Sequence, residues 1–257
     1  MVSSILKEFF MEEKCKNTIC KKLFAGFCIV ELLLLIALKI VEAIYTVTLA
    51  DTFIMFFAIL LNALFMLYAV MSIKKAGKDP AIIGIPLAVF TTLLADLFLV
   101  FLNDLAEGHV IGFISANVST MIGFLVFGMV QVVYAYHLGL TKRRVIIRVG
   151  FYLAFIVVVA VLNMLTLDRF IACLSMSQLI LNLIYGWIEH KKKKNRTSLL
   201  LAIGLTLFFG CDLFIMLRML LPASGFIYAF ICFMVWIFYI PSQVILTTSY
   251  LSERNEI

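Results

Sequence analysis

The sequence has few of the charged residues that soluble proteins place on their surfaces. Charged residues make up 14% of the chain, whereas soluble domains average about 25%. Hydrophobic residues make up 64%, and the mean hydropathy is +1.13. This composition excludes a soluble globular domain and indicates a chain that lies mostly within a lipid bilayer.

Cysteine and histidine are too few and too scattered to build a cross-linked or metal-bound domain. Two of the six cysteines lie in the basic N-terminal segment and the others within apolar stretches, so we expect reduced thiols. The histidines lie in different loops or helix ends, and the N-terminal cysteine pair has no second pair of ligands nearby. We therefore predict no metal site. The residues concerned are Cys15, Cys20, Cys28, Cys173, Cys211, Cys232, His109, His137 and His190.

Long apolar stretches fill the rest of the sequence. About 20 helical residues cross a hydrocarbon core about 30 Å thick, and eight stretches are long enough to do so. They predict an all-α, polytopic membrane protein with eight transmembrane helices and almost no room for a soluble domain. The predicted spans are 23–41, 52–73, 82–103, 111–138, 146–166, 169–189, 198–221 and 225–249.

The basic residues predict the orientation of these spans. Lys and Arg accumulate in short cytoplasmic loops, and alternation of the spans places 18 of the 21 on one face. Both termini are then cytoplasmic, with a basic tail at 1–22, a membrane domain at 23–250 and a second tail at 251–257. The basic run 191–194 indicates an orienting loop near anionic headgroups. No basic loop is interleaved with stacking aromatics, so we predict no nucleic-acid partner.

The sequence also bears on the membrane in which the chain resides. No cleavable signal peptide is visible, because the first span is too long for a signal h-region and no small-residue cleavage site follows it. Lys-rich loops without a trafficking motif favour a bacterial cytoplasmic membrane, and an endoplasmic reticulum membrane is the alternative. The sequence does not predict an oligomeric state.

Two aspartates occupy nearly the same local sequence inside predicted spans. Asp96 lies within Leu-Ala-Asp-Leu-Phe and Asp212 within Gly-Cys-Asp-Leu-Phe. A charge at membrane depth costs about 2.5 to 3.5 kcal/mol on the most lenient scale, and such residues usually mark functional sites. Both aspartates lie at the same predicted depth, somewhat past the midplane. We predict that they share one site.

The spacing of polar residues predicts a duplication. Asp96 to Asp212 is 116 residues, Gln131 to Gln243 is 112, and a weaker pair, Asn62 and Asn182, is separated by 120. These offsets predict two related halves, about 23–140 and 145–250. Because each half has an even number of spans, the two four-helix repeats would run parallel.

The remaining intramembrane polar residues allow two interpretations. The glutamines and asparagines, together with Glu31 in the first span, either line a polar chamber with the aspartates or hydrogen-bond between helices. The possible partner of Glu31 on its own helix, Lys39, is too distant for an i,i+4 pair. For the amides the interhelical interpretation is the simpler one, and for the two aspartates function is the better explanation.

Two level carboxylates in a dry chamber are suited to acid–base chemistry. Like charges held close do not both ionise readily, so one group tends to keep its proton while the other is an anion. This combination supplies a general acid and a general base at neutral pH. Cleavage through an oxocarbenium-like state needs both, one to protonate the substrate and one to guide water.

The chain resembles the YhhN-like lysoplasmalogenases and their animal counterparts, a family of eight-span membrane hydrolases. The family's Gly-Asp-x-x-Leu-like and Ser-Asp elements are similar to Ala95-Asp96-Leu97-Phe98-Leu99 and Cys211-Asp212. Its Gly-x3-Phe-x3-His-x2-Tyr and Ala-Gln elements are similar to Gly123-x3-Phe127-x3-Gln131-x2-Tyr134 and Ser242-Gln243. The departures are Ala95 for glycine, Cys211 for serine and Gln131 for histidine. Since glutamine does not titrate, proton transfer would fall to the aspartates.

The resemblance implies hydrolysis of the vinyl-ether bond of a lysoplasmalogen, which releases a fatty aldehyde without a cofactor. The catalytic residues would be Asp96 and Asp212, in roles that the sequence does not assign. Gln131, Tyr134 and Gln243 would orient the headgroup or glycerol of the lysophospholipid, and membrane lipids would be the other partners.

Two other functions remain open. Parallel repeats with midplane acids also fit a proton-coupled transporter of a small solute or lipid, although carriers commonly break helices at the site with Gly or Pro and only Gly210 lies close to an aspartate here. Pro241 lies beside Gln243 in the last span and is expected to disturb that helix. The histidine-to-glutamine difference also allows a catalytically silent, lipid-binding relative.

Overall fold

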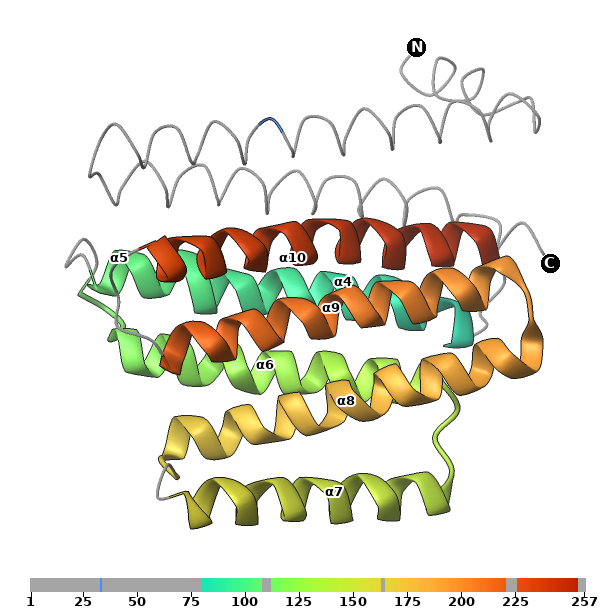
Figure 1. Cartoon of the computed structure of the whole chain (residues 1–257), viewed down its shortest axis with the longest axis horizontal. Coiled ribbons are helices and arrows are strands. Elements are labelled where there is room, and N and C mark those ends of the chain that lie inside the picture. Colours follow the sequence, from blue (N-terminus) through green and yellow to red (C-terminus); the bar gives the residue numbers. More distant parts are fainter. Residues whose placement is uncertain (1–32, 34–79, 108–111, 163–164, 221–225, 254–257) are drawn as a thin grey trace. The chain divides into compact units, whose positions relative to one another are not determined.

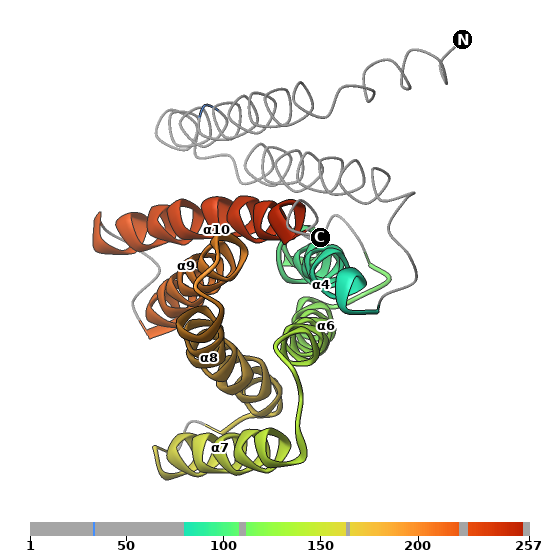
Figure 2. The ribbon, with the colours of Figure 1, turned by 90° about the vertical axis from the view of Figure 1, so that its right-hand side faces the viewer.

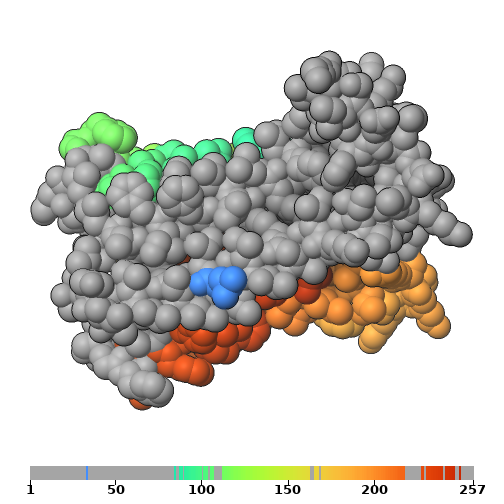
Figure 3. Space-filling view, turned by 90° about the horizontal axis from the view of Figure 1, so that it is seen from above, coloured from blue at the N-terminus to red at the C-terminus, as the bar shows by residue number. Residues whose placement is uncertain are grey.

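The computed structural model describes residues 33, 80–107, 112–162, 165–220 and 226–253. The chain divides into two compact units, Met1–Val47 and Thr48–Ile257. Of the first unit only Leu33, blue in Figure 3, is described. The predicted spans 23–41 and 52–73 therefore lie outside the described residues, apart from Leu33, as do Glu31, Lys39 and Asn62.

The described residues of the second unit are helical throughout apart from short connections, which confirms the predicted all-α class for this part of the chain (Figure 1). Long apolar sequences with few helix breakers account for this structure, because a helix satisfies its backbone hydrogen bonds internally. The elements are α4 (Pro80–Asp96), η1 (Leu97–Leu102), α5 (Asn103–Glu107), α6 (Ala116–His137), α7 (Lys142–Val161), α8 (Leu167–Lys193), α9 (Arg196–Leu220) and α10 (Phe226–Glu253).

Four of these helices are long and apolar enough to cross a membrane. They are Ala116–His137, Lys142–Val161, Arg169–Lys193 and Arg196–Leu217. Shorter apolar stretches, Phe90–Leu99 and Phe230–Leu246, lie along α4–η1 and α10. The six predicted spans from 82–103 onward thus each coincide with a helix or a run of helices, in the predicted order.

Five helices of this unit pack in a ring, seen end-on in Figure 2. α4 contacts α6, α6 contacts α8, α8 contacts α9, α9 contacts α10, and α10 returns to α4. α7 packs on α8 at the outside of this ring. The inward faces of α6, α8, α9 and α10 carry the buried residues, including Tyr134, Leu179, Leu205, Phe208 and Leu246.

α7 differs from the ring helices in how it is held. Its apolar side chains are largely exposed, and Arg148 is its one buried residue. Exposed apolar side chains are expected on a helix that faces lipid. The one buried side chain by which α7 joins the core of this unit is therefore an arginine.

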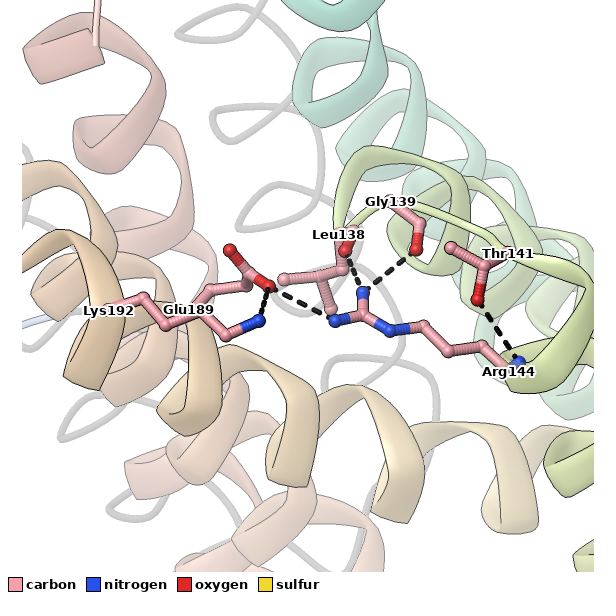
Figure 4. A network of polar contacts seen from close by, with 6 residues as sticks. All are labelled: Leu138, Gly139, Thr141, Arg144, Glu189 and Lys192. Carbon is pink, nitrogen blue, oxygen red and sulfur yellow. Dashed lines mark hydrogen bonds and ion pairs between the residues drawn. The ribbon is translucent and has the colours of Figure 1, made fainter.

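A network of polar contacts around Arg144 and Glu189, which we call the loop staple, holds the turn between α6 and α7 (Figure 4). Gly139 has a positive φ of 81°, which glycine adopts without strain. Arg144 donates to the carbonyl of Gly139 at 2.8 Å, and its backbone N–H donates to the hydroxyl of Thr141 at 3.3 Å. On α8, Glu189 accepts from Arg144 at 3.1 Å and from Lys192 at 3.4 Å. These bonds tie the turn to the basic end of α8.

Candidate functional site

Asp96 lies where a regular helix changes its hydrogen-bond pattern. It is the last of the 17 residues of α4, and a π-helix of six residues follows at once. π-helical turns are rare and frequently occur at functional sites. In this one the hydroxyl of Ser119 on α6 donates to the carbonyl of Phe98 at 2.7 Å. The altered turn therefore has a partner on the neighbouring helix.

A glycine on α6 allows this close approach. A Cβ added at Gly123 would lie 2.4 Å from the Cγ of Leu99 and 3.1 Å from its backbone nitrogen. Such contacts would push η1 away from α6. The hydroxyl of Thr120 adds a hydrogen bond of 2.9 Å to the side-chain oxygen of Asn103. Small and hydroxyl side chains on α6 thus hold the π-helix and the start of α5, and with them Asp96, against α6.

Tyr239 on α10 donates a hydrogen bond from its hydroxyl to Oδ2 of Asp96. The Tyr239 side chain is buried, with 6% of its surface exposed. Its ring lies 6.3 Å from that of Phe208 and 5.9 Å from that of Trp236, centroid to centroid. These two aromatic neighbours restrict the phenol ring. Tyr239 therefore orients Asp96 across the contact between α10 and α4.

Asp212 lies within electrostatic range of Asp96, although 116 residues separate the two along the chain. It is the 17th residue of α9, just as Asp96 is the 17th of α4. At about 1.5 Å per residue, both lie roughly 24 Å from the start of their helices. The side chains are partly buried. The structure thus brings together the two aspartates that the sequence predicted to share a site, while their roles stay a prediction.

Close packing of α9 on α10 supports Asp212. A Cβ added at Gly210 would lie 2.5 Å from the ring of Phe238, and one added at Gly204 would lie 2.7 Å from the Cγ of Leu246. The ring of Phe238 in turn lies 5.4 Å from that of Phe214. These two glycines let α9 approach α10, the helix that carries Tyr239.

A second polar centre joins α6, α7 and α8. Arg148 on α7, 5% exposed, donates to Oε1 of Gln178 at 3.0 Å and to Oδ1 of Asn182 at 2.8 Å. Asn182 donates to Oε1 of Gln131 at 3.0 Å and to its backbone carbonyl at 2.9 Å. The guanidinium carbon of Arg148 also lies 5.2 Å from the ring centroid of Tyr185. We call Arg148, Asn182 and Gln131 the amide chain.

Two polar groups on α6 have no hydrogen-bond partner. They are the Nε2 of Gln131 and the hydroxyl of Tyr134, and both side chains have 0% of their surface exposed. Leaving a buried donor unsatisfied costs about 1 to 3 kcal/mol. The residues lie three apart on one helix, so they project from the same face. These groups are the expected contacts for oxygen atoms of a bound ligand.

Two other predicted site residues, Gln243 and Asn182, are also buried. Gln243 is buried on α10, with 1% exposed. The side chain of Asn182 makes several hydrogen bonds between helices, which agrees with the simpler interpretation of the intramembrane amides. Among the described residues, no three His, Cys, Asp or Glu side chains gather as metal ligands would.

Two residues of the site were not predicted from the sequence. Tyr239 was not singled out among 9 tyrosines and 24 phenylalanines. Arg148 is one of the 18 basic residues that the sequence assigns to the cytoplasmic face, but it lies buried in α7 and bonds to two amides. Gln178 and Asn182, four residues apart and therefore on one face of an apolar helix, were the available signal that a polar partner must come from elsewhere.

Comparisons of the chain with protein-family models, with curated proteins and with solved structures found no match.

Proposed function

We propose that the protein is a membrane-embedded hydrolase of the vinyl-ether bond of lysoplasmalogens, with Asp96 and Asp212 as the acid–base pair. The observation that carries this proposal is their placement: two intramembrane carboxylates from α4 and α9 lie within electrostatic range, and a buried tyrosine orients one of them. Such a pair suits the acid and base of oxocarbenium chemistry. The similarity of the surrounding motifs to the YhhN-like lysoplasmalogenases supports the same reaction.

The hydrogen bond from Tyr239 to Asp96 assigns the roles of proton donor and proton acceptor to the two aspartates. Asp96 accepts this bond, so it is the group suited to accept a proton from water. The proton donor is then Asp212. Asp212 donates its proton to the vinyl carbon next to the ether-bearing carbon, and an oxocarbenium ion forms. Water adds to the ether-bearing carbon while Asp96 takes a proton from that water, which gives a hemiacetal.

Collapse of the hemiacetal restores both carboxyl groups. Its hydroxyl proton passes to Asp212, the carbon–oxygen bond to glycerol breaks, and the departing glycerol oxygen takes the proton from Asp96. The products are a fatty aldehyde and a glycerophospho-alcohol. Each aspartate ends as it began, so the scheme consumes only water and includes no cofactor.

The proposal extends to the architecture of the whole chain. We infer eight transmembrane helices arranged as two parallel four-helix repeats, with both termini cytoplasmic. The equal positions of Asp96 and Asp212 within α4 and α9 support the repeat. The basic end of α8 at residues 191–194 supports the orientation. We propose a bacterial cytoplasmic membrane as the location, with membrane lipids and a lysophospholipid as the partners.

Aldehyde release tests the function directly. The wild-type protein in detergent is incubated with choline and ethanolamine lysoplasmalogens, in parallel with Asp96→Asn and Asp212→Asn. The hydrolase predicts aldehyde release from the wild type and its loss in both variants. Absence of release by the wild type from both lipids would overturn the proposal, and binding without turnover would then favour a silent, lipid-binding relative.

One observation favours a proton-coupled transporter as the second candidate. The π-helix follows Asp96 directly, and Pro241 lies inside α10, two residues after Tyr239. Carriers place such interruptions of the regular helix next to their acids. Uptake of a lysolipid into proteoliposomes that depends on an imposed pH gradient, without aldehyde release, would favour this alternative.

A further inference from the structure

The amide chain has a direction that its chemistry fixes. A guanidinium has only donors, so the Asn182 atom that faces Arg148 at 2.8 Å must be the oxygen. The amide nitrogen of Asn182 then faces Gln131, and the Gln131 atom that accepts at 3.0 Å must be Oε1. The free end of the chain is therefore the Nε2 of Gln131, which is a donor.

This free donor is buried and unsatisfied. Gln131 has 0% of its surface exposed, and its Nε2 has no partner, as is true of the neighbouring Tyr134 hydroxyl. Hydrogen bonds in a chain polarise one another, so the charge of Arg148 strengthens the donor at the far end. An oxygen that accepts without donating, above all an anionic oxygen, is the group that this arrangement would bind.

The position of Gln131 along the bundle sets which part of a lipid it can reach. α4 and α6 run antiparallel, with Leu99 against Gly123 and Gly84 against His137. Asp96 precedes Leu99 by three residues and Gln131 follows Gly123 by eight, so both lie to the same side of that contact. At about 1.5 Å per residue, Gln131 lies roughly 7.5 Å nearer the basic loops than Asp96. An extended glycerol backbone spans such an interval between its ether carbon and its phosphate.

We propose that the amide chain is a phosphate-binding device, in which Arg148 acts through Asn182 to present Gln131 Nε2 to a phosphate oxygen of the bound lipid, with the Tyr134 hydroxyl as a second donor. The proposal rests on the lysophospholipid substrate proposed above, but it does not depend on hydrolysis. Arg148 and Asn182 are positioning residues. Gln131 and Tyr134 make the contact.

Two matched variants separate this role from a purely structural one. In Asn182→Asp the new carboxylate still accepts a hydrogen bond from Arg148 but donates none to Gln131. The side-chain amide of Gln131 is then free to rotate by half a turn, which exchanges the positions of its oxygen and its nitrogen. Gln178→Glu places a carboxylate against the same guanidinium without touching the bond to Gln131. Gln131→Glu keeps the acceptor for Asn182 and replaces only the free donor.

The probe is a saturated 1-O-alkyl lysophosphocholine, which has no vinyl bond to hydrolyse, and a 1-O-alkylglycerol without phosphate is its partner probe. Dissociation constants are measured by calorimetry with the full chain in detergent, and thermal unfolding checks that each variant is folded. We expect Asn182→Asp and Gln131→Glu to weaken binding of the phosphate lipid about tenfold or more. Gln178→Glu should stay within about twofold of the wild type.

The pattern of results decides the proposal. Equal weakening of both probes would show that the ether or glycerol oxygen, and not the phosphate, is the acceptor, and would overturn the phosphate assignment. The proposal would also be overturned if Asn182→Asp and Gln178→Glu had the same dissociation constant for the phosphate lipid and Gln131→Glu bound it as the wild type does. Failure of the wild type to bind either probe would overturn it as well. Aldehyde release from lysoplasmalogen is measured separately, so a loss of the hydrolase proposal would not be confused with a loss of this one.

Discussion

The two polar centres of this protein solve the problem of burying charge in opposite ways. At the aspartate pair, two acidic groups lie within electrostatic range of each other, and Tyr239 donates a hydrogen bond to one of them. At the amide chain, Arg148 donates two hydrogen bonds to the neutral amide oxygens of Gln178 and Asn182. The first arrangement places two acidic groups near each other, which a purely structural site would avoid. The second is a stable, directed scaffold.

This difference distinguishes residues that we propose to act on a substrate from residues that join helices. Residues that only join helices satisfy one another, as Asn182 does with Gln131 and Arg148. Residues that act on a substrate keep unsatisfied capacity, because the substrate completes it. Gln131 Nε2 and the Tyr134 hydroxyl keep such capacity, which agrees with their proposed contact with the ligand. Asn182 lies between Gln131 and Arg148 and bonds to both.

Removing either member of the aspartate pair should give the largest effect. Positioned acids and bases contribute about 10²- to 10⁴-fold to a rate, so Asp96→Asn and Asp212→Asn should each lower kcat for aldehyde release by that range. Glu189→Gln is the control, because it neutralises a carboxylate at the loop staple. Near-normal rates in either aspartate variant would remove that residue from the chemistry.

Tyr239→Phe should weaken the pair without dismantling it. The ring keeps its contacts with Phe208 and Trp236, but Asp96 loses a hydrogen bond, which for a charged group contributes about 1.5 to 3 kcal/mol. We expect kcat to fall roughly 10- to 100-fold with little change in KM. Tyr152→Phe removes a longer hydroxyl contact, 3.4 Å to the carbonyl of Phe170, and should leave the rate unchanged. Equal rates for the two variants would contradict the orienting role of Tyr239.

Arg148→Leu should act on the stability of the second centre. The side-chain oxygens of Gln178 and Asn182 would lose their donor, and an unsatisfied buried acceptor costs about 1 to 3 kcal/mol. Denaturant unfolding in detergent measures the loss. The control is Arg143→Leu, which removes an exposed arginine from the same helix. Equal stability of the two variants would mean that Arg148 does not hold α7 in place.

The smallest effect is expected at the loop staple. Glu189 pairs with Arg144 and Lys192 near the end of α8, and pairs that retain solvent contact contribute about 0.2 to 1 kcal/mol. Glu189→Gln should lower the free energy of unfolding by no more than this, and added salt should shrink the difference. A loss as large as that of Arg148→Leu would place the main anchor of α7 at the staple instead.

Much of the helical order follows from the sequence. The apolar stretches from residue 82 onward each predict a helix that the structure contains. The structure also brings Asp96 and Asp212 together, as the sequence predicted. Local pattern is sufficient here because apolar length dictates helices in a membrane protein. The matching sequences around Asp96 and Asp212 were the basis for predicting that the two aspartates share a site.

The π-helix, Tyr239 and the burial of Arg148 did not follow from the sequence. No Gly or Pro marks the change of hydrogen bonding at Leu97, which depends on the hydroxyl of Ser119 and the missing Cβ of Gly123. Tyr239 resembles any other aromatic wall residue until α4 lies beside α10. Arg148 is six residues from the start of α7, close enough to the basic turn to pass for a loop charge. Each depends on a contact between helices.

Deuterium incorporation tests the central claim most directly. The wild-type protein is allowed to hydrolyse lysoplasmalogen in D₂O, and the aldehyde is trapped at once and analysed by mass spectrometry. If the vinyl carbon is protonated, the aldehyde carries one solvent deuterium at the carbon next to the aldehyde group. Asp212→Asn should abolish the formation of this labelled aldehyde. Aldehyde without deuterium at that carbon, or labelled product formed equally fast by Asp212→Asn, would contradict an aspartate acid that protonates the vinyl ether.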